Sequence, residues 1–419
     1  MRRLLAVVLI AVPQAVAAQA VSQRGFVEAI GTYFPQDAKS DPVSLVGDLL
    51  VRDEWFVKPA PWVQFAFGGD VRANTHDQAD AHWRVDVSDR GRLRPALSVR
   101  RVSTTIHWGR LTVDAGKQFI RWGKTDIVAP TDRFAPRDFL NVIDNEFLPV
   151  TGVRGVVRVG SNTVDGVWVP ALTPSRIPLF DQRWTVTPPD APVSIVEAPL
   201  ELPAGAQTGV RWSHIGSRIE YSASFFDGFN HLPNIEVVPP LGPDRLTLVR
   251  RYPSLRSYGG DGVIPTPWFT VKVEAAYFTS DTPGTPGTPG TPGTPGTDEY
   301  VLYVVQIERQ RGEWALVGGY AGEHVTNRRA PLPFAPDRGL TRAAVGRASY
   351  TLDVNRSVSF EGAVRQSGEG AYLKVEYSQA AFEHWRTTVS GSLVSGAADD
   401  FIGQYHRNSH VTVALRYSF

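Results

Sequence analysis

Apolar and polar residues alternate with a period of two along many short segments of this chain. In residues 410–419, Val411, Val413, Leu415 and Tyr417 share one face with the terminal Phe419, and polar residues dominate the other face. This period indicates a β-strand, because successive side chains point to opposite faces of a sheet. The apolar face could form the core of a soluble sandwich, or it could contact lipid while the polar face contacts water.

The same alternation recurs in residues 63–74, 269–277, 358–365 and 373–378, with charged residues opposite the aromatic ones. Short and long connections between the segments also alternate, as in a membrane barrel with short periplasmic turns and long outer loops. We therefore predict an all-β fold, a transmembrane antiparallel β-barrel of about 16 strands, although 14 or 18 strands would also fit. The expected strands are 62–74, 96–108, 110–121, 153–159, 163–171, 206–214, 217–228, 256–264, 267–279, 298–311, 313–325, 342–353, 356–366, 369–380, 383–395 and 409–419.

Three other regions depart from this pattern. Residues 1–20 combine two arginines, an apolar run and the sequence Ala18-Gln19-Ala20, which predicts a cleaved secretory signal peptide. Residues 21–60 are expected to form an N-terminal periplasmic or plug segment with a short amphipathic helix, or else an ordinary lead-in to the first strand; the barrel proper then covers 61–419. Within the barrel, the Thr-Pro-Gly repeats of residues 282–297 predict a disordered outer loop.

Composition excludes several classes of protein. The 419 residues contain no cysteine, which rules out disulfides, thiolate metal sites and a cysteine nucleophile. The 43 basic and 42 acidic residues nearly cancel, so no field for non-specific nucleic-acid binding is expected. Neither paired metal-ligand spacing nor a Gly-x-Ser-x-Gly motif is present. We expect no enzymatic activity, no cofactor, no metal and no nucleic-acid partner.

A strand of alternating apolar residues that ends in Phe419, behind a signal peptide, resembles the C-terminal signature of Gram-negative outer-membrane barrels of the porin type. The resemblance implies residence in the outer membrane, contact with its lipid, and recognition of this strand by the barrel assembly machinery. A homo-oligomer is a further possibility. The long connection at residues 121–152 is similar to the inward-folded third loop of general porins, which narrows the lumen.

Charged residues of this connection and of the inward strand faces are the candidate pore residues. Rings of charge set the barrier that ions meet in a lumen. Inward bases outnumber inward acids in our assignment, which favours anionic solutes, and acids on the loop would oppose bases on the wall; ordinary solvation of a wet lumen is the alternative explanation. The constriction candidates are Arg121, Lys124, Asp126, Asp132, Arg133, Arg137, Asp138, Asp144 and Glu146, and the wall candidates are Arg72, Arg154, Arg158, Arg211, Lys272, Arg365, Lys374 and Arg416.

The function that these features predict is a porin-like channel for passive diffusion of small hydrophilic solutes, constricted by the 121–152 loop. A barrel of this size encloses water, and selection then depends on pore width and wall charge. One alternative is a gated barrel for hydrophobic or polymeric substrates, plugged by residues 21–60 and by the long loop. Another is an adhesin or assembly platform that acts through its loops.

Overall fold

The computed structural model describes residues 21–38, 41–126, 128–185, 194–238, 245–280, 299–327 and 340–419. The expected signal peptide and the Thr-Pro-Gly repeats lie outside these residues. In the described part of the chain, no helix is both long and apolar enough to cross a bilayer.

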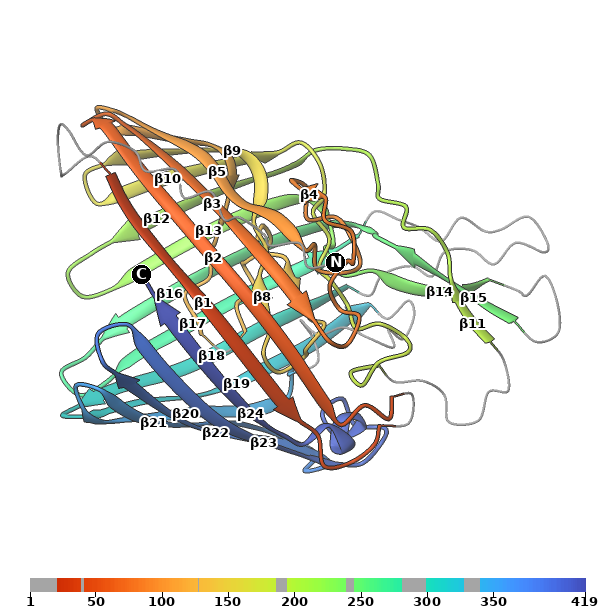
Figure 1. Cartoon of the computed structure of the whole chain (residues 1–419). Helices are drawn as coiled ribbons and strands as arrows, with labels where there is room; N and C mark the ends of the chain where they lie inside the picture. Colours follow the sequence, from red (N-terminus) through yellow and green to blue (C-terminus); the bar gives the residue numbers. More distant parts are fainter. Residues whose placement is uncertain are drawn as a thin grey trace.

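Eighteen antiparallel strands close into one barrel within the described residues (Figure 1). Closure comes from β1 and β24, the first and last strands, which pair from Phe26 with Ser418 to Tyr33 with Val411. The two-residue strand β4 (Val85–Asp86) adds to this sheet by parallel pairing with β5. The barrel strands are β1 (Val21–Tyr33), β2 (Leu45–Ala60), β3 (Val63–Asn74), β5 (Leu97–Trp108), β6 (Leu111–Gln118), β9 (Val150–Val159), β10 (Asn162–Val169), β12 (Gln207–Ile215), β13 (Glu220–Phe229), β16 (Ser254–Pro265), β17 (Thr270–Thr279), β18 (Glu299–Arg311), β19 (Trp314–Asn327), β20 (Ala343–Asp353), β21 (Arg356–Arg365), β22 (Gly370–Ala381), β23 (Trp385–Gly396) and β24 (His410–Ser418).

Each of the expected strands coincides with a strand of the barrel, and two strands were not anticipated. The expectation of a plug or periplasmic segment at residues 21–60 is wrong, because these residues form β1 and β2. They are needed there because β24 would otherwise present an unpaired edge to the membrane. The count is therefore eighteen among the described residues, the larger of the alternatives to sixteen.

Short turns join the strands at one end of the barrel and most long connections lie at the other end (Figure 1). At the long-loop end, β11 (Ser194–Glu197), β14 (Asn234–Val238) and β15 (Arg245–Arg251) form a small sheet that projects beyond the rim (Figure 1). The connection between β23 and β24 contains a 3-10 helix at Gly403–Asn408. The connection between β6 and β9 contains β7 (Arg137–Asp138) and β8 (Glu146–Phe147).

The two faces of the barrel differ as the alternation predicts. Val411, Val413 and Leu415 of β24 are 48%, 48% and 44% exposed on the outer face, although they are apolar. Thr412 and Arg416 of the same strand point inward, where they bond to Thr32 and Glu28 of β1. Trp62, Trp108, Trp268, Trp314 and Trp385 are exposed near the short turns. Such a ring of aromatic residues is typical of a membrane interface.

Candidate functional site

Residues 119–149, between β6 and β9, form a loop that contacts the inner wall of the barrel on opposite sides. Its first limb, residues 120–134, lies against β10, β13 and β16 to β18. Trp122 and Phe134 meet edge to face at 5.2 Å, and Phe134 meets Phe226 of β13 at 5.1 Å. The apolar cluster consists of Ile120, Trp122, Phe134, Val150, Val167, Val169, Phe226, Leu255, Ala276, Phe278, Tyr300 and Leu302. Burial of these side chains fixes the first limb to one wall.

Small wall residues make room for this limb. A Cβ atom on Gly209 of β12 would lie 2.8 Å from both Phe134 Cε2 and Trp122 Cη2. A Cβ atom on Gly259 of β16 would lie 2.8 Å from Thr131 Cγ2. Both distances are shorter than carbon atoms tolerate, so glycine at these positions is what lets the loop approach the wall.

Polar groups of the first limb bond to β17 and β18. Glu274 of β17 accepts hydrogen bonds from Thr125 and Thr131, through both backbone and hydroxyl groups, and from the backbone of Lys124. The carboxylate of Asp126 lies 3.2 Å from Lys272 Nζ and accepts a 2.7 Å bond from Gln306. Burial acts to raise the pKa of Asp126, but these hydrogen bonds and the charge of Lys272 lower it below the ordinary value. Asp126 is therefore ionised at neutral pH.

The second limb, residues 138–146, reaches strands on the other side of the lumen. Asp144 pairs with Lys374 of β22. Glu146 lies 3.2 Å from Arg52 of β2 and 3.9 Å from Arg72 of β3. The side chains of Asp144 and Glu146 are 40% and 48% exposed. Their ion pairs are therefore weaker than buried contacts and depend on salt.

Asp138 joins the loop to neighbouring connections. It pairs with Arg94 at 2.9 Å and with Arg176, which in turn pairs with Asp89 at 3.0 Å. Asp89 also bonds to Lys117 of β6 at 2.6 Å. Burial acts to raise the pKa of Asp138, but the charges of Arg94 and Arg176 lower it below the ordinary range. This buried network ties together the loops at 75–96, 119–149 and 170–206.

Arg137 differs from the other arginines of the loop. Its guanidinium donates to Asn145 Oδ1 at 2.8 Å and lies 4.1 Å from the Phe147 ring centre, with Arg121 at 4.2 Å from the same ring. Among the described residues, no carboxylate lies within ion-pair distance of Arg137. Burial lowers its pKa to about 10, and the charges of Arg121 and Arg133 act in the same direction, against that of Asp132. Arg137 is charged at neutral pH, and no carboxylate of the described ranges serves as its counter-ion.

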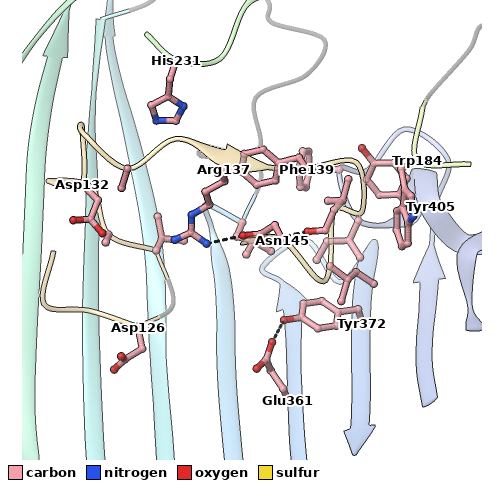
Figure 2. A pocket seen from close by; sticks show the side chains of 18 of the residues that line it. Asp126, Asp132, Arg137, Phe139, Asn145, Trp184, His231, Glu361, Tyr372 and Tyr405 are labelled. Atoms are coloured by element: carbon pink, nitrogen blue, oxygen red, sulfur yellow. Dashed lines mark hydrogen bonds between the residues drawn. The ribbon is translucent and has the colours of Figure 1, made fainter. Parts of the chain in front are cut away.

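Two cavities lie beside the loop. One has a volume of about 290 Å³, and Figure 2 shows Asp126, Asp132 and Arg137 on its loop side with Tyr372 and Glu361 on the barrel wall. His231 also lines it, and its pKa is well below the ordinary value because of burial and the charges of Arg133 and Arg137. The other cavity has a volume of about 260 Å³. It is lined by Asp144 and Glu146 of the second limb and by wall residues of β1 to β3 and β22 to β24. Both cavities therefore border charged side chains.

The structure brings most of the predicted constriction residues to these cavities. Asp126, Asp132, Arg133 and Arg137 line the first and Asp138, Asp144 and Glu146 line the second. Arg121 and Lys124 line neither; they pair instead with Asp132 and Glu220, both at 3.3 Å. Asp132 also accepts 2.6 Å bonds from the backbone of Trp122 and Gly123, so it shapes the loop as well as lining the cavity.

Most predicted wall bases have a carboxylate partner. Arg158 is exposed near the turn at residues 160–161. The paired bases and their partners are Arg72 with Asp48 and Glu146, Arg154 with Asp165, Arg211 with Asp261, Lys272 with Asp126 and Glu308, Arg365 with Asp400, Lys374 with Asp144 and Glu376, and Arg416 with Glu28. Simple counts of inward bases and acids therefore overstate the unbalanced charge of the wall.

Several charged residues of the lumen were not anticipated. Arg52 lies on β2, which was not read as a strand. Gly69 of β3 pairs with Val99 of β5, and Gly68 pairs with Arg101, so Arg100 occupies a bulge in β5. Both arginines reach inward acids. The consecutive arginines in the sequence were a signal of this bulge, since strict alternation would send one of them to the apolar outer face. Arg94, Arg176 and Arg183 come from loops whose contacts the sequence does not specify.

Comparisons with known proteins show similarity of structure only. No protein-family model matches the sequence, and no curated protein matches it. Similar solved structures include a BenF-like porin from Pseudomonas fluorescens Pf-5 (TM-score 0.54, 9% identity, 96% of this chain and 97% of that chain covered) and Acinetobacter baumannii OccAB1 (0.52, 11%, 96% and 95%). Pseudomonas aeruginosa OpdQ is a third (0.50, 10%, 95% and 98%). The chain thus has the fold of the Gram-negative outer-membrane porins.

Proposed function

We propose that this protein is an outer-membrane channel for passive diffusion of small hydrophilic solutes, constricted by the 121–152 loop. The observation that supports it best is the position of this loop, which bonds to β17 and β18 on one side and to β22 and β2 on the other. Cavities of about 290 and 260 Å³ lie beside it. The porin fold and the outer face of exposed apolar residues agree with residence in the outer membrane.

We further propose that wall and loop charges select among solutes. Loop acids oppose wall bases at Asp126 with Lys272, Asp144 with Lys374, and Glu146 with Arg52. Such pairs create a field across the opening rather than along it, and that field would orient dipolar solutes. Arg137, which lacks a carboxylate partner among the described residues, adds a preference for anions.

In the gated alternative, residues 21–60 cannot serve as the plug, since β1 and β2 of the wall lie there, and the long loop is left as its only proposed plug. The partners that we propose are outer-membrane lipid and the barrel assembly machinery. The latter would read β24, whose end is fixed by hydrogen bonds in both directions between Gly25 and Phe419. A homo-oligomer remains a prediction, which a measurement of the mass of the protein in detergent would test.

Planar bilayers test the proposal. Purified protein should give steady ohmic conductance, and a salt gradient should give a reversal potential on the anion-selective side. A barrel that inserts, as shown by protease protection in vesicles, but carries no current would overturn the channel proposal. A reversal potential that indicates cation selectivity would reject the proposed preference for anions, but it would still support the channel proposal.

A further inference from the structure

Glu274 is a buried carboxylate in the middle of the lumen wall. It lies on β17 and is 2% exposed. Among the described residues no basic side chain forms an ion pair with it. Its charge is balanced instead by hydrogen-bond donors, which within the described residues all belong to Lys124, Thr125 and Thr131 of the loop. A buried charge without partners is costly, so these donors must be present whenever the carboxylate is dry.

The donors surround both oxygens of the carboxylate. Oε2 accepts from the Lys124 backbone at 2.9 Å and the Thr125 backbone at 3.1 Å, and it lies 2.9 Å from the Thr125 hydroxyl, whose one proton it shares with the Val128 carbonyl at 2.6 Å. Oε1 accepts from the Thr131 backbone at 2.9 Å and the Thr131 hydroxyl at 2.8 Å. Hydrogen bonds to an ionised acceptor are stronger than those to a neutral one. One wall residue therefore binds both ends of the turn at residues 124–131.

The surrounding contacts fix where this turn lies. Gly259 leaves space for the Thr131 methyl group, and Gln306 of β18 accepts a 2.9 Å bond from the Asp126 backbone. The second limb is held at Asp138 by the buried pairs with Arg94 and Arg176, and at Asp144 and Glu146 by half-exposed ion pairs, which salt screens. The contacts of Glu274 are thus the main polar attachment of the first limb to this wall, and Asp144 and Glu146 of the second limb contact the opposite wall.

We propose that Glu274 is a positioning residue, which sets how far the loop extends into the pore without contacting the solute. This inference depends on the proposed channel function. A glutamine at position 274 would keep the size of the side chain but would present an amide N–H₂ to groups that are themselves donors. The turn would then lose part of its attachment, and the loop would move.

The test is single-channel recording of Glu274→Gln beside Glu361→Gln. Glu361 is also an inward carboxylate, but its described hydrogen bond comes from Tyr372 of the wall, so this control removes the same charge without touching the loop. We expect Glu274→Gln to show larger conductance with rapid transitions between levels, and Glu361→Gln to shift the reversal potential at a steady level. Glu274→Asp, which keeps the charge, should restore part of the steady level.

The loop side provides a second variant in case Glu274→Gln fails to fold. Replacing Thr125 and Thr131 together by valine removes two donors and leaves the wall charge in place, and it should produce the same transitions. If Glu274→Gln folds and behaves like Glu361→Gln, or if the double valine variant is as steady as wild type, the positioning role is rejected. A silent wild-type barrel would instead reject the channel proposal itself.

Discussion

Glu146 shows how single residues define the field in the lumen. Its carboxylate lies 3.2 Å from Arg52, 3.9 Å from Arg72 and 3.9 Å from Arg100. Burial acts to raise the pKa of Glu146, but the charges of these three arginines lower it below that of an ordinary glutamate. A lowered carboxyl pKa means that the negative charge persists to lower pH than usual.

We predict that Glu146→Gln shifts the reversal potential toward stronger anion preference, because it leaves the three guanidinium groups without this counter-charge. The difference between wild type and variant should stay constant from about pH 8 to about pH 5 and should shrink only below about pH 4.3, the ordinary value for glutamate. Subtracting the two titrations cancels the histidines that both proteins share. A difference that fades near pH 6 would show that Glu146 is not held ionised by the arginines.

The residues of this site were predictable in part. Strict alternation along the strand is enough to send Arg72, Lys272 and Lys374 inward, and the structure pairs all three with acids. Alternation fails at Arg100, where a bulge places two consecutive side chains on one face. The pairing partners themselves were not predictable, because they come from strands and loops that lie far apart in the sequence.

At the scale of elements, the loop at residues 119–149 depends on close approach to β12. Gly209 faces the rings of Trp122 and Phe134, and a β-carbon there would lie 2.8 Å from each. Overpacking of this kind typically costs about 1–3 kcal/mol. The wall itself is held by its hydrogen-bond ladder, so the loop is the part that must move.

We therefore predict that Gly209→Val leaves the barrel folded but displaces the first limb of the loop. Limited proteolysis of folded protein in detergent should cut residues 119–149 faster in the variant than in wild type. Gly166→Val is the matched control, since a β-carbon on Gly166 of β10 meets nothing within 4 Å. Equal cleavage of the two variants would contradict the proposed docking of the loop.

The sequence predicted a long loop that folds inward, but not how it docks. Its length and its mixture of Trp, Phe and charged residues were visible. Its attachment to Glu274 was not, because that contact joins residues 149 positions apart and depends on glycines in other strands. Long-range contacts of this kind have no local sequence signal.

At the scale of the whole molecule, the barrel closes only because β1 and β2 join it. The outer face of β1 carries Gly25, Val27, Ala29 and Gly31, so this face consists largely of small residues. The alternation of apolar and polar residues along β1 is therefore weak. That is why β1 was not predicted, whereas in β2 the consecutive Leu49 and Leu50 lie on opposite faces and obscure the alternation. The even total follows from closure of an antiparallel sheet whose termini lie at the same end.

The final prediction concerns the face that this barrel turns to its surroundings. Val413 is 48% exposed on the outer face of β24, whereas its neighbour Thr412 points inward and bonds to Thr32. If the outer face contacts hydrocarbon, Val413→Arg should destabilise the inserted barrel by about 2–4 kcal/mol at mid-bilayer depth. Thr412→Arg should cost far less, because a guanidinium in the lumen remains hydrated. Urea titration of folding into phospholipid vesicles measures both, and equal effects at the two positions would mean that lipid does not contact this face.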